Sequence, residues 1–217
     1  MIHGRVERLL LARRATRSKL LVLTFDDGPG DGLTSAILAL LAASDVKATF
    51  FLLGRNIVGR EEIVRRIAGD GHEICSHGYD HLHYWKVSPL RVVRDIKQGW
   101  RAIDAALGRQ GGRYVFRPPY GKLTLIGLLY LLILRVPVAY WTADSTDTWP
   151  LDRRDSRRLA DILRRTGGAV TLSHDFERSD PSVSKNVVDS LRLVLNTAKE
   201  QEVRTATISE LLALRER

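Results

Sequence analysis

The stretch from Lys19 to Leu53 reads KLLVLTFDDGPGDGLTSAILALLAASDVKATFFLL, and the fold class can be inferred from it. Both of its ends are short apolar runs rich in strand-forming residues, while the apolar residues between them recur at helical spacing. The first run stops at the turn sequence DDGP, residues 26–29. The stretch therefore predicts a strand, a polar loop, a helix and a second strand.

The same alternation of strand-like and helix-like segments continues along the chain. The expected strands lie at residues 19–25, 47–53, 72–76, 113–116, 136–142, 169–172 and 203–207. The expected helices lie at residues 33–43, 61–69, 89–107, 123–134, 157–165 and 183–199, with a last one from Ser209. About seven strands, each followed by a helix, predict an α/β domain of parallel strands, either an open sheet or a closed barrel. The chain length fits a single domain.

The chain is basic, with 34 Lys and Arg against 25 Asp and Glu and a formal net charge of +9. Such a charge suits an anionic partner, but the arginines are spread over helix-like segments and no nucleic-acid motif accompanies them. We therefore expect no nucleic-acid partner. Residues 1–19 predict a basic helical extension ahead of a domain at residues 20–217. Its cations leave contact with anionic lipid open: Arg5, Arg8, Arg13, Arg14, Arg17 and Lys19.

Apolar runs in the sequence are short. The run in the first 19 residues, Leu9 to Ala12, is far below a signal-peptide core, so we expect a cytoplasmic protein, with membrane association left open. The longest run, residues 123–134, is about half of the roughly 20 residues that span a bilayer, and it predicts a buried helix. Cys75 is the only cysteine and is expected to be a small buried hydrophobe.

Polar side chains follow most of the expected strands. Each signal alone is weak, because an Asp-Asp-Gly-Pro turn is more often only a turn and a His-x-x-x-His pair arises by chance. The loops after the carboxyl ends of parallel strands, however, converge on one mouth. The coincidence predicts an active site built from these residues: Asp26, Asp27, His77, His81, Arg117, Tyr120, Asp144, Asp147, Ser173, His174 and Asp175.

Five segments resemble, in this order, the motifs of the polysaccharide deacetylases, carbohydrate esterase family four. They are TFDDGP at 24–29, HGYDH at 77–81, RPPYG at 117–121, DSTDTW at 144–149 and LSHD at 172–175. The resemblance extends from about Leu20 to Ile208. It implies a distorted (β/α) barrel of about seven parallel strands. It also implies a hydrolase that removes acetyl groups from N-acetylated sugars of the N-acetylglucosamine type.

The resemblance implies a metal site formed by Asp27, His77 and His81. Two imidazoles and one carboxylate leave a coordination position open for water, as in catalytic zinc sites. Zinc is the first expectation for the divalent metal, with Co²⁺, Ni²⁺ and Mn²⁺ left open. The metal would acidify the water, and Asp26, the implied general base, would accept its proton. Arg117 would orient Asp26 and bind it bidentately.

Further implied roles concern the acyl group and the leaving amine. Tyr120 would lend its backbone N–H to the oxyanion, Leu172 would line the pocket for the acetyl methyl group, and Trp149 would lie with them at the substrate. His174 would be the general acid, steadied by Asp147.

Two departures from the family pattern affect these expectations. Gly78 occupies a position where the family usually has Ser or Thr, so a hydroxyl that would tie the His loop down is missing. An extra residue separates the second Asp of DSTDTW from its Trp, which leaves Asp144 as an alternative to Asp147 as the partner of His174.

Two other functions stay open beside a sugar N-deacetylase. An O-acetyl polysaccharide esterase would use the same site. A non-catalytic carbohydrate-binding relative would have no reason to keep both Asp26 and His174. The sequence does not identify the glycan or the oligomeric state.

Overall fold

Seven parallel strands form one sheet within residues 2–214, the part of the chain that this computed structural model describes. The strands are β1 (Leu20–Val22), β2 (Thr24–Asp26), β3 (Thr49–Leu52), β4 (Glu73–Ser76), β5 (Ala143–Asp144), β6 (Ala169–His174) and β7 (Arg204–Thr205). Their order is β4-β3-β2-β6-β1-β7, with β5 also paired to β6. Met1 and residues 215–217, the outer ends of the predicted extension and domain, lie outside the described residues.

The sheet curves into a distorted barrel, as the resemblance implied. From β6 the strand pairing passes through β2 and β3 to β4. Single parallel bridges continue it from Ser76 to Phe116 and from Phe116 to Val138. The chain that follows Val138 reaches β5, which pairs with the other side of β6. The ring of backbone pairing therefore closes on β6.

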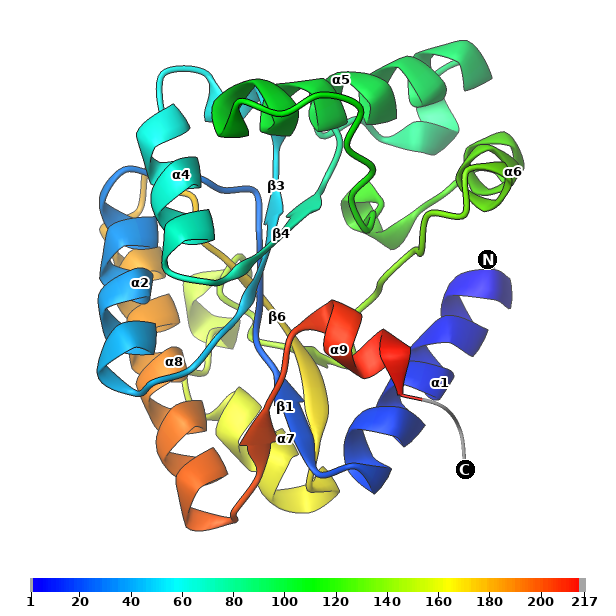
Figure 1. Cartoon of the computed structure of the whole chain (residues 1–217). Coiled ribbons are helices and arrows are strands. Elements are labelled where there is room, and N and C mark those ends of the chain that lie inside the picture. Colours follow the sequence, from blue (N-terminus) through cyan, green and yellow to red (C-terminus); the bar gives the residue numbers. More distant parts are fainter. Residues whose placement is uncertain (1, 215–217) are drawn as a thin grey trace.

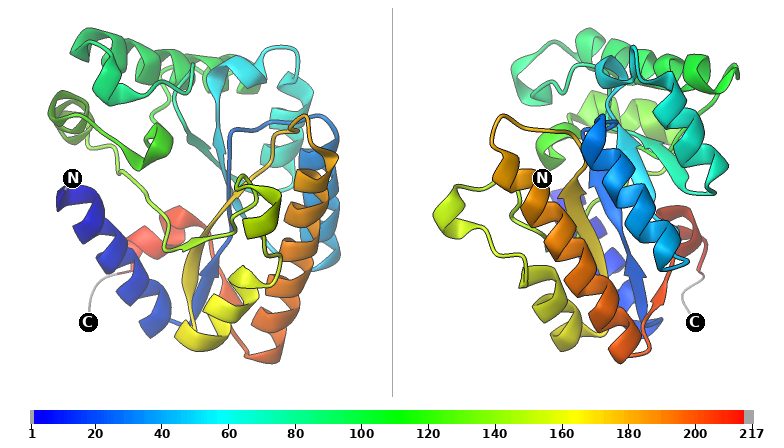
Figure 2. Two further views of the ribbon diagram at one scale, coloured as in Figure 1. Left: turned by 180° about the vertical axis from the view of Figure 1, so that it is seen from behind. Right: turned by 90° about the vertical axis from the view of Figure 1, so that its left-hand side faces the viewer.

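Helices cover the outside of the barrel and one of its ends. They are α1 (Ile2–Arg17), α2 (Gly32–Ala43), α3 (Gly54–Ile57), α4 (Glu61–Gly69), α5 (Pro89–Leu107), α6 (Leu125–Ile133), α7 (Arg158–Thr166), α8 (Pro181–Glu200) and α9 (Ile208–Ala213). Figures 1 and 2 show α2 and α8 side by side on one flank, with α1 and α9 on the opposite flank. The loops that form the site described below lie between these flanks.

Alternate residues of β1 enter two different cores. Leu21 packs with the helices of the first flank, including α2 and α8, in the larger apolar cluster. Leu20 and Val22 face a second cluster, which also contains Leu11 and Ala15 of α1. Because successive side chains of a strand point to opposite faces, one short strand holds both layers. The helix α1 therefore packs directly against the barrel, while the boundary at residue 19 stays a prediction.

The expected helices agree with the structure within one or two residues, except for α3, a single turn that the pattern did not predict. Two expected strands, residues 113–116 and 136–142, are wrong. Only Phe116 and Val138 form bridges there, and β5 begins at Ala143. Pro137 has no N–H to donate to a ladder, which limits the second of them.

The expected strand at 19–25 divides into β1 and β2. At the break, the Thr24 N–H donates to the Thr171 side-chain oxygen at 3.2 Å, and the Thr24 hydroxyl donates to the Thr171 carbonyl. A side chain thus takes the place of the regular backbone ladder. Beyond the break, β2 pairs with β3, whereas β1 pairs with β7. This change of partner lets the chain bend into the barrel wall.

The prediction that residues 123–134 form a buried helix is wrong in its burial. The helix is α6, and only Gly127 and Leu131 of it are buried. Leu125 is 70% exposed and Ile133 is 79% exposed. None of the helices among the described residues has the length and apolar character needed to cross a membrane. Cys75 is buried, as predicted, and burial raises the pKa of its thiol well above its usual value.

Candidate metal centre and catalytic cleft

The carboxyl ends of β2, β4 and β6 open into a cleft of about 780 Å³. Most of the predicted site residues line it: Asp26, Asp27, His77, His81, Tyr120, Asp144, Leu172 and His174. Arg117 and Asp147 lie behind them and are fully buried. Trp149 is not among the lining residues, and its carbonyl instead accepts a hydrogen bond from Arg154. Ser173 and Asp175, which were predicted with this set, are buried and are also not among the lining residues. The convergence expected from the strand order is therefore present for the rest of the set.

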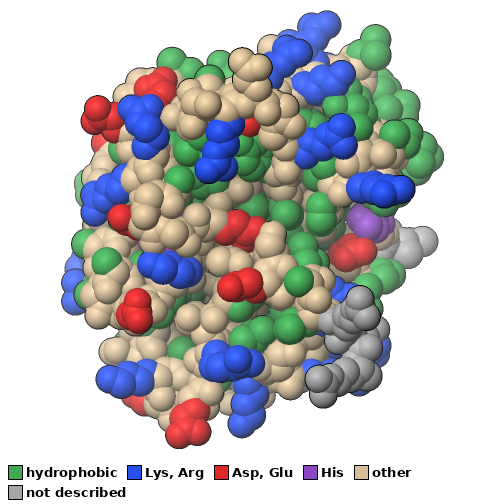
Figure 3. All heavy atoms as spheres, in the orientation of Figure 1, with side chains coloured by type: hydrophobic (Ala, Val, Ile, Leu, Met, Phe, Trp, Pro, Cys, Tyr) green, Lys and Arg blue, Asp and Glu red, His purple; other side chains and the backbone are tan. Residues whose placement is uncertain are grey.

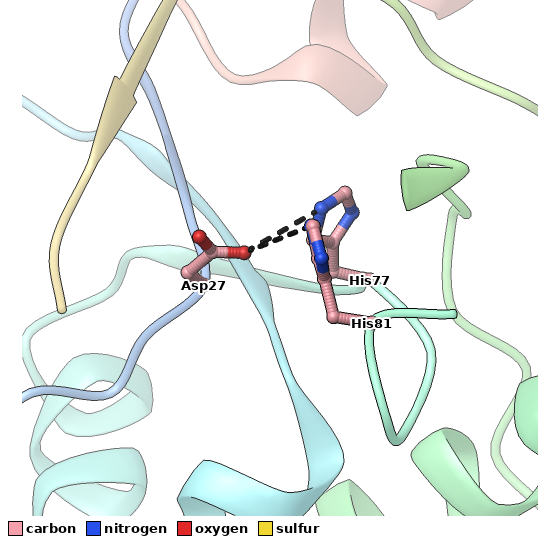
Figure 4. Close-up of side chains that lie close together, drawn as sticks. All are labelled: Asp27, His77 and His81. Carbon is pink, nitrogen blue, oxygen red and sulfur yellow. Dashed lines mark ion pairs between the residues drawn. The ribbon is translucent and has the colours of Figure 1, made fainter. Parts of the chain in front are cut away.

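Asp27, His77 and His81 form a group that could hold a metal ion, with one ligand atom from each residue and all three atoms within 4.8 Å of one another. Figure 4 shows the Asp27 carboxylate facing the two imidazoles, which come from the loop after β4. Asp27 Oδ1 lies 3.7 Å from His77 Nε2 and 3.4 Å from His81 Nε2.

Two observations indicate that these residues fit a metal. Asp27 Oδ1 is buried and has no hydrogen-bond partner, whereas Oδ2 accepts a hydrogen bond from Arg178 at 2.9 Å. A buried carboxylate oxygen without a partner is costly unless a cation binds it. His77 Nδ1 lies 2.8 Å from the Arg117 carbonyl oxygen, so Nδ1 carries the proton and Nε2 is left as a ligand.

Burial, reinforced by the neighbouring His77, lowers the pKa of His81 to about 4. The neutral imidazole, which is the form that binds metals, is therefore the form present at neutral pH. His81 and Asp27 both adopt left-handed backbone conformations, with φ of 56° and 72°. Such conformations are uncommon for residues other than glycine and often occur at functional sites.

Arg117 binds Asp26 through one nitrogen, so the expectation of a bidentate contact is wrong. Its Nη1 donates to Asp26 Oδ1 at 2.6 Å and to the Thr24 hydroxyl at 2.7 Å. The second nitrogen, Nη2, donates instead to the Tyr140 carbonyl at 3.2 Å. The guanidinium carbon also lies 3.9 Å from the Phe51 ring centroid. The other Asp26 oxygen, Oδ2, lies 3.8 Å from His77 Nε2, and Asp26 lines the cleft.

On β6, where His174 is the register partner of Asp26, the side-chain partner of His174 is Asp147. Asp147 Oδ1 accepts from His174 Nδ1 at 2.9 Å, and Oδ2 accepts from the His174 backbone N–H at 2.8 Å. Asp144 instead accepts from the Thr146 N–H. Burial alone would lower the pKa of His174, but the Asp147 carboxylate outweighs it and raises this pKa to about 9. The imidazole is therefore protonated at neutral pH.

A residue that the sequence reasoning missed, Asp95 of α5, holds the His loop in place. Its carboxylate accepts from the Tyr79 N–H at 3.1 Å, the Asp80 N–H at 2.8 Å and the Tyr84 hydroxyl at 2.7 Å. Asp95 interrupts the buried face of α5 beside Ile96, and that acid among apolar positions was the available signal.

The position of Asp95 also explains Gly78. A Cβ at Gly78 would overlap the Asp95 carboxylate and press on the Tyr84 hydroxyl, and Gly78 has φ of 85°. A carboxylate that reaches in from α5 therefore occupies the space that a side chain at residue 78 would need, and it holds the loop.

Comparison with known proteins gives consistent results. The family model "Polysaccharide deacetylase" matches residues 13–127, more than half of the chain. Peptidoglycan-N-acetylglucosamine deacetylase PgdA of Listeria monocytogenes is 31% identical over 91% of this chain, which spans 40% of the length of that relative. The chitooligosaccharide deacetylase of a Bradyrhizobium strain is 32% identical, over 84% of this chain and 78% of that protein.

The fold also matches a solved structure. The Bc1960 peptidoglycan N-acetylglucosamine deacetylase superposes with a TM-score of 0.80 at 27% identity, over 92% of this chain and 91% of that one.

The packing around Gly78 predicts that the substitution Gly78→Ser, which introduces the residue usual in the family, weakens metal binding. The new side chain displaces Asp95 from the loop, so we expect metal affinity to fall by about 10- to 100-fold, the usual effect of losing a group that orients the ligands. The measurement is metal affinity by competition with a chromophoric chelator.

Gly59→Ser is the matched control, because Gly59 has φ of 80° but open space around it. It should share the backbone strain and keep the metal affinity. Equal losses in both variants would show that strain alone, not Asp95, is responsible.

Proposed function

This chain belongs to the polysaccharide deacetylase family, and we propose that it is a metal-dependent hydrolase that releases acetate from N-acetylglucosamine-type sugars. The observation behind the proposal is the juxtaposition, in one cleft, of a candidate metal group with two differently supported titratable residues. Asp26 is paired with Arg117, and His174 is paired with Asp147. The choice of sugar is supported by two relatives, a peptidoglycan-N-acetylglucosamine deacetylase and a chitooligosaccharide deacetylase.

Asp27, His77 and His81 would hold the metal, and zinc is the ion that two imidazoles and one carboxylate suit best. When bound, the metal would supply Lewis acidity toward water and the acyl oxygen. The remaining work belongs to side chains of this protein. In this proposal the Arg117 guanidinium orients the Asp26 carboxylate, which accepts the proton of the attacking water.

Breaking the amide C–N bond requires a proton on the departing nitrogen, because an amine anion is a very poor leaving group. In the proposal this proton comes from the His174 imidazolium, which Asp147 stabilises. Leu172 gives the cleft an apolar wall that suits the acetyl methyl group, and Trp141 lines the same cleft. Tyr120, at φ of 57°, is proposed to offer its backbone N–H to the oxyanion.

The alternative functions differ in which residues of the site they need. An O-acetyl esterase would use the same residues but would not need His174 as an acid to the same degree, since an alkoxide or phenolate leaves more readily. A non-catalytic sugar-binding protein would have no reason to keep both Asp26 and the His174–Asp147 pair at the cleft. The presence of both therefore favours catalysis.

Neighbouring aspartates are predicted to give opposite phenotypes. We expect the wild-type protein to release acetate from an N-acetylglucosamine oligomer. Asp26→Asn should keep the metal and lose roughly 10²-fold or more in rate, because it removes the general base. Asp27→Asn should instead lower the metal content, because it removes a proposed ligand. Acetate release and metal content measured on the same preparations test this assignment, and an exchange of the two phenotypes would reverse it.

The pH dependence of the rate is predicted to follow His174. The acid must be protonated, so N-deacetylation should fall as pH rises through about 9. Asp147→Asn removes the carboxylate that raises this pKa, so the alkaline limb should move to lower pH. Asp144→Asn is the control and should leave the limb in place, since Asp144 bonds elsewhere. An aryl acetate, which expels a stable phenolate, should show little of this limb. An equal loss of rate at alkaline pH on both substrates would show that His174 is not the general acid.

A further inference from the structure

The outer surface of α6 exposes a continuous set of large apolar side chains. Five of its nine residues are exposed: Leu125, Ile126, Leu129, Leu132 and Ile133. At about 100° of rotation per residue these five positions fall within an arc of roughly 120°, on one side of the helix. Figure 3 shows hydrophobic side chains gathered at this edge of the molecule, with Lys and Arg side chains beside them. Scattered apolar residues are common on protein surfaces, whereas a contiguous patch usually marks an interaction site.

The chain segment that contains α6 carries positive charge and no negative charge. Residues 105–143 contain no Asp or Glu. Lys122 and Arg135 lie just before and just after α6, and Arg113 donates to the Leu134 carbonyl at the end of the helix. The neighbouring helix α5 adds Lys97, whose Nζ lies 5.6 Å from the Tyr130 ring centroid. We refer to the five apolar residues with these cations as the α6 surface.

An amphipathic aromatic residue lies at the edge of this surface. Trp85 is 44% exposed, its indole N–H donates to the Leu123 carbonyl at 3.3 Å, and Lys122 Nζ lies 5.0 Å from its ring centroid. Tryptophan and lysine are the side chains typical of the boundary between lipid headgroups and acyl chains.

We propose that the α6 surface docks on the surface of an anionic lipid bilayer. Apolar side chains on one arc, flanking cations and an edge tryptophan are the features of an element that lies in the interface plane. The nine residues of α6 span about 14 Å, less than half of the roughly 30 Å hydrocarbon core, so the helix lies on the bilayer and does not cross it. The cations suit anionic headgroups, and the same cations on a second copy of this surface would repel them.

The proposed lipid contact is at α6, whereas the sequence left open a lipid contact through the cations of the N-terminal helix. Arg8 of α1 stacks on Trp141, with its guanidinium carbon 4.0 Å from the ring centroid, so it is held against the protein. Arg5, in contrast, is exposed and lines a groove of about 720 Å³ together with Leu125 and Leu128 of α6. The N-terminal helix thus contributes to one border of the α6 surface.

The same groove connects the α6 surface to the catalytic cleft. Tyr120 and Lys122 line both. A bilayer docked on α6 would therefore lie beside the mouth of the cleft. This consequence rests on the proposed function: the accessible substrate would be an N-acetyl sugar displayed at an anionic membrane surface.

Vesicle flotation of the full chain tests the docking without any measurement of activity. We expect binding to vesicles of phosphatidylcholine with 30% phosphatidylglycerol, and little binding to pure phosphatidylcholine, in ~0.1 M salt. The double variant Leu129→Glu/Ile133→Glu should lower the partition coefficient tenfold or more, because each exposed apolar side chain in the contact accounts for roughly tenfold. Thermal unfolding by circular dichroism checks that the variant remains folded.

The control is Val58→Glu/Leu151→Glu, which changes two exposed apolar residues outside the α6 surface and should keep the binding. Wild-type protein that stays unbound with both vesicle types would overturn the proposal. So would a Leu129→Glu/Ile133→Glu variant that floats like the wild type. A concentration-dependent dimer, abolished by the same double variant, would assign the surface to a second copy of the chain and would also overturn it.

Discussion

Arg117 is fully buried, and its guanidinium lies 2.6 Å from the Asp26 carboxylate. The same side chain donates to Thr24 and to the Tyr140 carbonyl, and its own backbone carbonyl faces His77 Nδ1. One residue therefore ties together β2, the loop after β4 and the segment that closes the barrel. Removing either member of a buried pair leaves an unpaired charge and typically costs about 3–5 kcal/mol. The candidate metal centre depends on Arg117 in two ways: its side chain positions Asp26, the proposed base, and its backbone carbonyl positions His77, a proposed ligand.

Two histidines of the cleft, His81 and His174, have very different pKa values. Burial and His77 lower the pKa of His81 to about 4, whereas Asp147 raises the pKa of His174 to about 9. The two imidazoles thus differ in protonation at neutral pH, one suited to binding a metal and the other to giving up a proton. Environments that push titratable groups apart in this way are typical of acid–base chemistry.

The sequence predicted the elements that rest on strong periodicity and on turn composition. The helices around residues 61–69 and 89–107 have the expected bounds, and the convergence of Asp26, His77 and His174 follows from their positions at strand ends. What could not be predicted depends on tertiary contacts. Three features of the site are decided by contacts between residues far apart in the chain. They are whether Asp144 or Asp147 supports His174, how many nitrogens of Arg117 reach Asp26, and which side chain holds the loop at Gly78. The prediction that α6 is buried failed for the same reason. Composition alone does not show whether another element covers an apolar helix.

The central claim is that Asp27, His77 and His81 converge on one divalent metal beside the Arg117–Asp26 pair. X-ray absorption at the metal edge of the zinc-loaded protein tests it most directly. The account predicts one ion with two imidazole nitrogens at about 2.0–2.1 Å and the rest of the shell oxygen, with no sulfur. A shell of oxygens without imidazole scattering, or a sulfur ligand from Cys75, would contradict it.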